Sequence, residues 1–507
     1  MTLEYISHSC FLVKSKGIKL IFDPWIKGTA YQGQWQLYPK PMNLSQVKEA
    51  NLVLISHGHE DHLHHESLKE ISKNATVFFP FQWRAGIVSY LKGMGFGDVK
   101  ECVSFRTYEY QHIKVTFLGF SLESVIVVEA EDQVIVNIND SLNSNHKTAV
   151  KFLIDSIKKR WDKIDFLLSG WSGAGYFPNM VHFKGKDDKE IAKIREQYFA
   201  DNFCKFTKAL NPTVAIPFAP GFALLEDSNR WINEVKFPRT EAENYYKTYF
   251  DKGSKVQFPI MFPGDYFEGD QFIQKSPLHA YGGDEALCRD IPLAFDKEIK
   301  EANRIVNITE EEISVLVKDL KFWLKKNAGM YDREVIDDVN FSIFCKDITV
   351  DPWLCVTSNN GELTLVRDSK AQDSSKMNIT TRGTLLALNL TKDWGGDLLT
   401  IGYGLDVEVF DGSCLENNLD IVCVRLITRF PMFKDDMLSH TGRIMKYYFN
   451  NPALTHLWLK QKISLRSQVN KRQFNERDRW ITFNKCELCK VCKIPEYNFE
   501  NSEEVGS

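Results

Sequence analysis

Short apolar runs of strand length recur along the first half of the chain, and Val and Ile dominate several of them. Some are apolar nearly throughout, which is typical of strands in a sheet that is covered on both faces. We therefore predict buried strands over residues 17–25, 51–57, 75–81, 114–120, 124–131, 133–140, 165–170 and 213–219.

Helical periodicity appears between and after these runs. Residues 146–161 and 189–210 place apolar side chains at intervals of three and four positions, which predicts amphipathic helices. A further helix is expected over 309–328, because Thr309 and Glu312 have the spacing of a capping box. Strands mixed with helices in this way indicate an α/β fold.

The length of the chain, 507 residues, exceeds what one compact core usually holds. We predict a catalytic domain over 1–295, an α+β accessory domain over 296–475, and a cysteine-containing, partly disordered tail over 476–507. Residues 236–295 are expected to form long loops and short strands that complete the first domain. Strand-like runs in the second domain cover 362–366, 398–410 and 420–427.

Composition narrows the classes of protein that the chain can belong to. The formal net charge of -4 provides no general attraction to nucleic acid. No apolar run approaches the roughly 18 residues of a membrane span, and the N-terminus lacks the features of a signal peptide. Most of the 11 cysteines are scattered inside apolar segments, which favours reduced thiols and a cytoplasmic protein.

A cluster of ligand-type side chains follows directly after the apolar run at 51–57. Five of the 12 histidines fall within residues 57–65, and residues 57–62 read His-Gly-His-Glu-Asp-His. A bound divalent metal needs several imidazoles or carboxylates at one point, and two adjacent metals often share an oxygen ligand. A polar, solvated loop is the alternative interpretation. We predict metal ligands at His57, His59, Asp61 and His62.

This H-x-H-x-D-H pattern resembles the signature of the metallo-β-lactamase superfamily, whose fold is a four-layer αββα sandwich with one or two metals. Within that superfamily, the chain is most similar to the part of the CMP-N-acetylneuraminate hydroxylase family, and of its bacterial relatives, that lacks a Rieske domain. The segments that carry this likeness are Asp-Pro-Trp at 23–25, Gly28, and the stretches 170–178, 217–222, 262–265 and 394–402.

The resemblance also implies further ligands. It assigns a metal-bridging role to Asp140, at the end of the predicted strand 133–140. Members of the family carry two more histidines, and this chain lacks both: Ser121 and Glu123 are the nearby polar residues at the first place, and Glu226 stands at the second. We predict Glu226 as a ligand. A site rich in carboxylates favours one or two divalent ions of iron or manganese, with zinc as the alternative.

Further contributions to the site are expected. The resemblance places His8 at its rim, where we predict that it acts with Asp61 in catalysis. Asp23 is expected to orient a metal-binding histidine, as carboxylates behind such ligands commonly do. Glycines in the stretch 169–178 allow a ligand to approach the backbone closely, although a plain tight loop is the alternative. We predict substrate contacts from Trp171, Ser172 and Tyr176.

The resemblance implies a metal-dependent enzyme that hydroxylates or otherwise oxidises a polar small molecule, including one linked to a nucleotide. The chain has no Rieske signature of C-x-H followed by C-x-x-H. Electrons would then come from a separate electron-transfer protein, from the substrate, or from the cluster Cys486, Cys489 and Cys492. The alternatives are a metallo-hydrolase of an ester, amide or phosphodiester, and a non-catalytic binding protein on a degenerate site.

Overall fold

The computed structural model describes residues 1–82, 86–120, 123–143, 147–177, 179–183, 187–236, 238–370, 374–392, 395–410, 419–429, 441–443, 445, 446, 449, 450, 452, 456 and 459. The predictions for Trp394, for the three clustered cysteines Cys486, Cys489 and Cys492, and for the tail over 476–507 lie outside these residues.

The first sheet contains eight strands in the order β18-β17-β1-β2-β3-β6-β7-β8. Its N-terminal strands β1 to β3 form an antiparallel meander, and β3, β6, β7 and β8 then run parallel to one another. The strands are β1 (Thr2–Ser7), β2 (Cys10–Ser15), β3 (Ile18–Phe22), β6 (Leu52–Leu54), β7 (Thr76–Pro80), β8 (Asp98–Cys102), β17 (Tyr266–Glu268) and β18 (Gln271–Ile273).

The second sheet contains six strands in the order β15-β13-β12-β11-β10-β9. Strands β9 to β12 are antiparallel, and β12, β13 and β15 are parallel. The strands are β9 (Thr107–Tyr110), β10 (Ile113–Phe120), β11 (Glu123–Ala130), β12 (Gln133–Asn139), β13 (Phe166–Gly170) and β15 (Val214–Phe218). Each predicted strand segment of the first domain therefore contains an observed strand.

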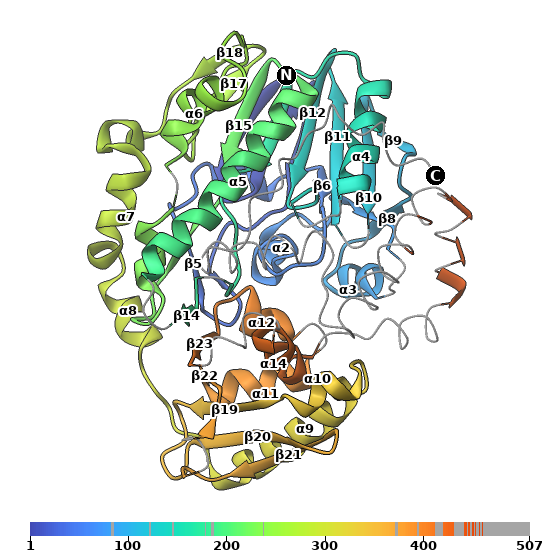
Figure 1. The fold of residues 1–507 in the computed structure, drawn as a ribbon. Coiled ribbons are helices and arrows are strands. Elements are labelled where there is room, and N and C mark those ends of the chain that lie inside the picture. Colours follow the sequence, from blue (N-terminus) through green and yellow to red (C-terminus); the bar gives the residue numbers. More distant parts are fainter. Residues whose placement is uncertain are drawn as a thin grey trace.

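These two sheets pack face to face, and helices cover both outer faces (Figure 1). One apolar core joins the sheets, for example Phe11 and Leu54 with Val115 and Ile126. The helices α1 (Leu44–Lys48), α2 (His65–Glu70) and α3 (Ile87–Gly93) cover the first sheet. The second is covered by α4 (Lys147–Arg160), α5 (Asp188–Leu210) and α6 (Ala242–Tyr249). The four-layer αββα prediction is confirmed.

The stretch 236–295 is more helical than predicted, because its apolar residues are spaced for helices that pack on the sandwich. It holds α6, α7 (Gly283–Ala294) and the 3₁₀ turns η2 (Arg239–Glu241) and η3 (Pro277–Tyr281). A small third sheet lies near the carboxyl ends of the main strands. It consists of β4 (Thr29–Ala30), β5 (Trp35–Leu37) and β16 (Phe222–Leu224), followed by η1 (Arg230–Glu234).

The C-terminal region forms a separate α+β unit around a six-stranded sheet in the order β14-β23-β22-β19-β20-β21 (Figure 1). Its strands are β14 (Val181–Phe183), β19 (Asn340–Cys345), β20 (Trp353–Asn359), β21 (Glu362–Arg367), β22 (Met377–Thr381) and β23 (Leu405–Val409). The helix α8 (Asp296–Ala302) leads into this unit. Its own helices are α9 (Glu310–Ala328), α10 (Arg333–Asp337), α11 (Gly383–Thr391), α12 (Gly396–Thr400) and α14 (Leu419–Ile427).

One strand prediction in this unit is wrong, and a second holds only in part. Residues 420–427 belong to the helix α14, and the run 398–410 divides into part of α12 and the strand β23. A short, continuously apolar run has no periodicity that separates a strand from a buried helix. In α14 every residue except Arg425 is buried, so its sequence carries no polar face. The predicted capping box of α9 at Thr309 and Glu312 is present.

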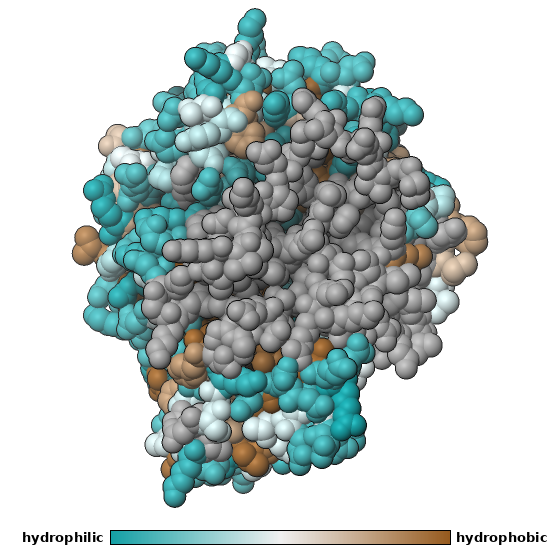
Figure 2. Space-filling model, viewed as in Figure 1, coloured by the Kyte–Doolittle hydropathy of each residue, from teal (hydrophilic) through white to brown (hydrophobic). Residues whose placement is uncertain are grey.

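Strand β14 comes from within the predicted first domain but pairs in parallel with β23 of the C-terminal sheet. The chain thus crosses between the two units before residue 295, and the domain boundaries stay a prediction. Hydrophilic side chains cover most of the described surface on the face shown in Figure 2. Within the described part of the chain, we find no helix with the length and apolarity needed to cross a membrane.

Candidate metal centre

Parallel strands deliver the ligand-type residues to one edge of the sandwich. Asp23 follows the end of β3, and the loop 56–62 follows β6. Asn139 is the last residue of β12, and Asp140 comes directly after it. Because the carboxyl ends of parallel strands meet at the same edge, residues far apart in sequence converge there. His8 reaches the same place from the turn between β1 and β2.

The first group of ligand-type side chains consists of His57, His59 and Asp140. His57 Nε2 lies 2.8 Å from His59 Nδ1 and 3.6 Å from Asp140 Oδ2. His57 is buried, whereas the Asp140 side chain is 47% exposed. The group is therefore open to solvent on the Asp140 side.

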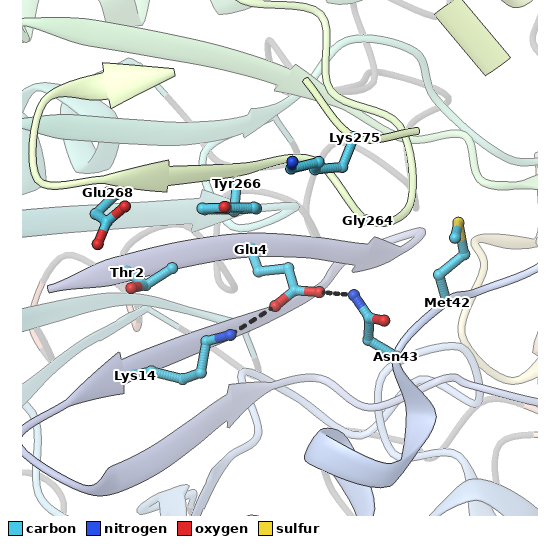
Figure 3. Close-up of a pocket in the computed structure, with 9 residues that line it drawn as sticks. All are labelled: Thr2, Glu4, Lys14, Met42, Asn43, Gly264, Tyr266, Glu268 and Lys275. Carbon is cyan, nitrogen blue, oxygen red and sulfur yellow. Dashed lines mark hydrogen bonds and ion pairs between the residues drawn. The ribbon is translucent and has the colours of Figure 1, made fainter. Parts of the chain in front are cut away.

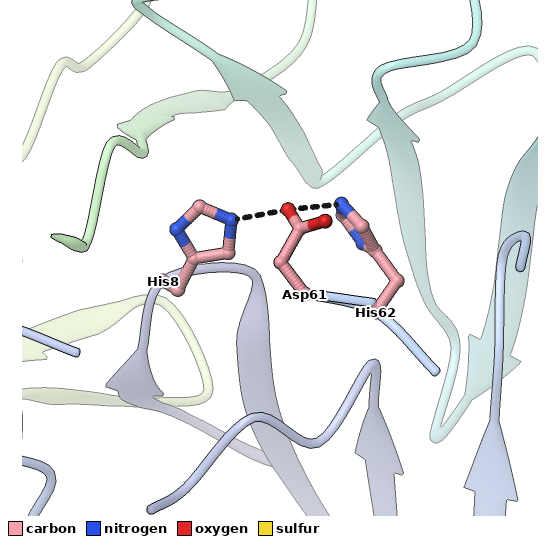
Figure 4. Close-up of side chains that lie close together, drawn as sticks. All are labelled: His8, Asp61 and His62. Atoms are coloured by element: carbon pink, nitrogen blue, oxygen red, sulfur yellow. Dashed lines mark hydrogen bonds and ion pairs between the residues drawn. The ribbon is translucent and has the colours of Figure 1, made fainter. Parts of the chain in front are cut away.

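The second group consists of His8, Asp61 and His62, and all three are buried (Figure 4). Asp61 Oδ2 lies between the two rings, 3.0 Å from His8 Nε2 and 3.0 Å from His62 Nε2. Asp140 Oδ2 lies 3.3 Å from the same His62 nitrogen. Asp140 therefore connects the second group to the first.

The spacing of these atoms fits bound metal. Ligand atoms that bind one tetrahedral ion at about 2 Å stand roughly 3.3 Å apart, and the His62 Nε2 to Asp140 Oδ2 distance is 3.3 Å. His62 Nε2 is also a buried atom with no hydrogen-bond partner of acceptable geometry. A buried polar atom without a partner is costly, and a metal would satisfy it.

Hydrogen bonds behind the site set which nitrogen of each ring is free. Ser56 Oγ donates to Asp23 Oδ2 at 2.8 Å, so His57 Nδ1 must donate to Ser56 Oγ at 2.9 Å. His62 Nδ1 faces Asp23 Oδ2 at 3.2 Å. With a proton on Nδ1, His57 turns an Nε2 lone pair toward the centre of the site. His62 turns its Nε2 atom to the same point, where a metal would take the place of the proton on that nitrogen.

Burial and neighbouring charges shift the pKa values of the site in opposite directions. Burial, with the nearby His62 and His59 rings, holds the pKa of His57 well below its usual range, so this ring is neutral, as a metal ligand must be. Loss of water contacts at the site opposes the charged form of Asp140, although its side chain is partly exposed, but the positive charge of His62 outweighs this effect and lowers the pKa of Asp140 to about 2. Asp61 is likewise held ionised by His62 and His8 against the effect of burial.

Several residues at or near the centre have an unusual backbone conformation. Positive φ angles occur at His8 (38°), Asp23 (37°), Tyr31 (54°), Asn139 (54°) and Ala219 (50°). Each such residue costs of order 1–3 kcal/mol unless the surrounding structure holds it. The fold maintains this backbone at the same edge that gathers the ligand-type side chains.

Four of the residues predicted to bind metal or substrate lie outside the two groups. Glu226 pairs with Arg382 Nη2 at 3.0 Å, so the arrangement offers no support for it as a ligand. Trp171 is fully buried against Phe203, and Ser172 Oγ donates to a Glu196 carboxylate oxygen. The Tyr176 amide donates to the carbonyl of Thr400 in the C-terminal unit at 2.7 Å. Substrate contacts from Trp171, Ser172 and Tyr176 stay a prediction.

Sequence reasoning missed three residues that shape the centre. Tyr31 donates its hydroxyl proton to Asp61 Oδ1 at 2.7 Å, and no pattern around it signals this role. Ser56 and Asn139 each precede a predicted ligand directly, which was an available signal. Asn139 Nδ2 donates to Ser56 Oγ at 2.8 Å. The next histidine along the chain, His64, belongs to neither group. It caps α2, and its ring accepts a hydrogen bond from the Ser67 amide at 3.1 Å.

A separate surface hollow lies along β1, β2 and β17, as Figure 3 shows. None of the predicted site residues lines it. The buried Glu4 at its floor is paired with Lys14 Nζ at 3.0 Å and with Asn43 Nδ2. Glu4 is thus satisfied within the protein, and the hollow is not the candidate active site.

Comparison with known families finds a match in the N-terminal region. The family described as "Beta-lactamase superfamily domain" matches residues 2–150 of the 507. This part of the chain is therefore similar to a β-lactamase superfamily domain. That range holds both groups of ligand-type residues described above, from His8 to Asp140.

The chain is similar to cytidine monophosphate-N-acetylneuraminic acid hydroxylases. The protein from Danio rerio is 25% identical over 258 residues, which cover 48% of this chain and 42% of that protein. The protein from Xenopus laevis is 26% identical over 263 residues, with the same coverage. The match therefore spans less than half of the length of these relatives.

Solved structures share parts of the fold at low similarity. CmlA, a diiron β-hydroxylase from Streptomyces venezuelae, is 17% identical, with a TM-score of 0.37 over 54% of each chain. Igni18, a metallo-hydrolase from Ignicoccus hospitalis, is 15% identical, with a TM-score of 0.34 over 53% of this chain and 98% of that one.

Proposed function

We propose that this chain is a metal-dependent enzyme that oxidises or hydroxylates a polar small molecule. The observation that carries the proposal is the junction of two groups of ligand-type side chains at Asp140 Oδ2, with His62 Nε2 free to bind. The similarity to hydroxylases that act on a sugar nucleotide supports this class of reaction and a substrate of that kind.

The donors at the two groups favour a hard metal ion. His57, His59 and Asp140 would hold one ion, and Asp61, His62 and Asp140 a second. Carboxylate oxygens next to imidazoles suit iron or manganese better than thiolate-rich sites do, and zinc is the alternative. Iron bound there would supply the activation of dioxygen that a hydroxylation requires.

The protein itself contributes orientation, exclusion of water and an entry side. Ser56 and Asp23 hold the rings of His57 and His62 with their Nε2 atoms turned inward. Burial of the second group keeps bulk water away, which strengthens electrostatic interactions there. Asp140 is the exposed member, so a substrate would approach from its side.

Oxidation needs a source of electrons. We propose that a separate electron-transfer protein provides them, because the sequence contains no Rieske motif. The substrate itself or the cluster at Cys486, Cys489 and Cys492 are the other sources that the sequence suggests.

A metallo-hydrolase is the second candidate. The observation in its favour is that Asp140 is shared by the two groups, which would place two metals close together. In two-metal hydrolases such a pair stabilises the attacking and the leaving oxygen of the substrate. An ester, amide or phosphodiester would then be the substrate.

Metal analysis combined with two activity assays separates these candidates. We expect protein purified without chelator to contain near-stoichiometric iron and to consume oxygen when given a reductant and a sugar nucleotide. Zinc or manganese with turnover of phosphodiester or ester substrates would favour the hydrolase.

His59→Ala should bind metal at least about tenfold more weakly than wild type, since a ligand is removed. His65→Ala is the matched control, because His65 is exposed and contacts Tyr90 instead. Protein that binds no metal under any of these conditions would overturn the proposal.

A further inference from the structure

His8 differs from the other buried imidazoles of the centre in the partner of its Nδ1 atom. The backbone N–H of Gly221 donates to His8 Nδ1 at 3.0 Å. The other ring nitrogen, Nε2, lies 3.0 Å from Asp61 Oδ2. His8 is thus held at both nitrogens, by a donor on one side and by a carboxylate on the other.

The contact between Gly221 and His8 is built into the fold. A Cβ atom on Gly221 would stand 2.5 Å from His8 Cα and 2.6 Å from His8 N, so only glycine allows this approach. The His8 ring also packs edge-on against Trp25, with ring centroids 5.2 Å apart, and it is nearly fully buried. Neither the ring nor its backbone has room to rotate away.

A backbone N–H can only donate, so Nδ1 of His8 must be an acceptor without a proton. An imidazolium has no acceptor nitrogen, and this contact therefore requires the neutral ring with its proton on Nε2. His57 shows the opposite arrangement, since its Nδ1 donates to Ser56 Oγ, and His62 likewise faces the Asp23 carboxylate with Nδ1 and turns Nε2 toward the centre. A nitrogen that carries a proton has no lone pair to offer a metal.

We propose that His8 is a positioning residue and not a metal ligand, although it lies within ligand distance of Asp61 and His62. Its Nε2–H donates to Asp61 Oδ2, while the hydroxyl of Tyr31 donates to Asp61 Oδ1 at 2.7 Å. The two donors fix the plane of the Asp61 carboxylate. Each oxygen keeps a further lone pair for a metal.

The consequence of this inference for metal binding rests on the proposed function, whereas the tautomer of His8 does not depend on it. If a metal occupies the second group, Asp61, His62 and Asp140 hold it, and His8 sets the orientation of Asp61 from behind. His8 then does not take the place of either of the two histidines that the family carries and this chain lacks. Carboxylates outnumber imidazoles around that ion.

Nuclear magnetic resonance of the full chain with ¹⁵N-labelled histidine rings tests the tautomer directly. The His8 signals are assigned by their loss in His8→Gln. We expect the pattern of a neutral ring protonated at Nε2, both in metal-free protein and after addition of Zn²⁺ as a diamagnetic probe. A proton on Nδ1 in the metal-free protein, or loss of the Nε2 proton on addition of Zn²⁺, would overturn the proposal.

Metal affinity of two variants tests the role. A glutamine side chain can offer an N–H to Asp61 but no imidazole nitrogen, whereas alanine offers neither. We expect His8→Gln to bind Zn²⁺ within about threefold of wild type and His8→Ala to bind about 10–100-fold more weakly. Equal loss in both variants, or no loss in His8→Ala, contradicts the inference. If wild-type protein binds no metal, the proposed function fails, while the tautomer measurement on metal-free protein still decides this point.

Discussion

At the scale of single residues, Asp23 has the largest set of contacts behind the centre. It accepts hydrogen bonds from the Ser56 amide at 2.7 Å, from Ser56 Oγ at 2.8 Å and from Asn139 Nδ2, and it faces His62 Nδ1. The side chain is fully buried. One carboxylate thus aligns the ends of β3, β6 and β12 and orients two candidate ligands.

Asp23→Asn should weaken metal binding by about 10–100-fold, which is the usual effect of removing a carboxylate that orients a ligand. The amide that replaces one oxygen cannot accept from all of these donors. Titration with Zn²⁺ measures the affinity, and Asp132→Asn is the control, since Asp132 lies at an exposed turn. Unchanged affinity in Asp23→Asn would show that the carboxylate does not orient the ligands.

Gly221→Ala should lower the free energy of unfolding by about 1–3 kcal/mol, the usual cost of forcing extra atoms into packed surroundings. The added Cβ would overlap the backbone of His8, which cannot move without disturbing Asp61. Urea unfolding measures the change. Gly97→Ala is the control, because nothing lies within 4 Å of a Cβ at that exposed position. Equal stabilities for the two variants would contradict the overlap.

At the scale of elements, His182 joins three segments at the seam between the sandwich and the C-terminal unit. Its Nδ1 lies 2.6 Å from Asp188 of α5, and its Nε2 lies 2.7 Å from Asp406 of β23. The hydrogen bond with Asp406 contributes most to raising the pKa of His182 to about 9, against the opposing effect of burial. A charged imidazole therefore holds β14 between two carboxylates.

Stability should fall as the pH rises through this range. The pKa of His182 in the folded protein, about 9, exceeds the ordinary value of 6.5. The charged His182 therefore stabilises the fold fully below pH 6.5, and this stabilisation is lost as the pH approaches 9. We expect a loss of about 1–2 kcal/mol, because water screens these partly exposed groups. Urea unfolding at pH 6 and pH 9 measures it. His182→Gln should reduce the difference between the two pH values, and an equal difference in this variant would exclude His182 as its source.

At the scale of the whole molecule, the C-terminal unit contributes part of the surroundings of the centre. The Leu398 carbonyl accepts from Gln34 Nε2 at 2.8 Å, and Arg382 pairs with Glu226 at 3.0 Å. Gln34 lies beside β5, whose Trp35 stacks on Phe222 with ring centroids 3.7 Å apart. Gln34 Nε2 also donates to the carbonyl of Tyr31 at 2.8 Å, and Tyr31 contacts Asp61, so the C-terminal unit reaches the centre through these two residues.

Metal binding should stabilise the whole chain by mass action. A ligand at 100 times its dissociation constant adds about 2.7 kcal/mol to the unfolding free energy if it binds only the folded protein. We expect a chelator to lower Tm and excess Zn²⁺ or Fe²⁺ to restore it. His59→Ala should show a smaller response than His65→Ala. A Tm independent of metal in wild type would argue against a site formed only by the folded chain.

Much of the fold could be predicted because buried strands and amphipathic helices carry their own patterns. The strand before His57 and the helix capped by Thr309 are local features, and both are observed. Apolar runs without a polar face were the exception, as at 420–427, where packing against α9 selects a helix.

The sequence by itself determined the ligand-rich loop at 57–62, because those residues are neighbours along the chain and follow a buried strand. Only the tertiary structure decided that His8 meets Gly221, 213 positions away, and that Tyr31 reaches Asp61. Such contacts depend on how strands are ordered in two sheets, and residue spacing does not encode that order. The tautomer of each imidazole, and with it the role of His8, follows from those long-range partners.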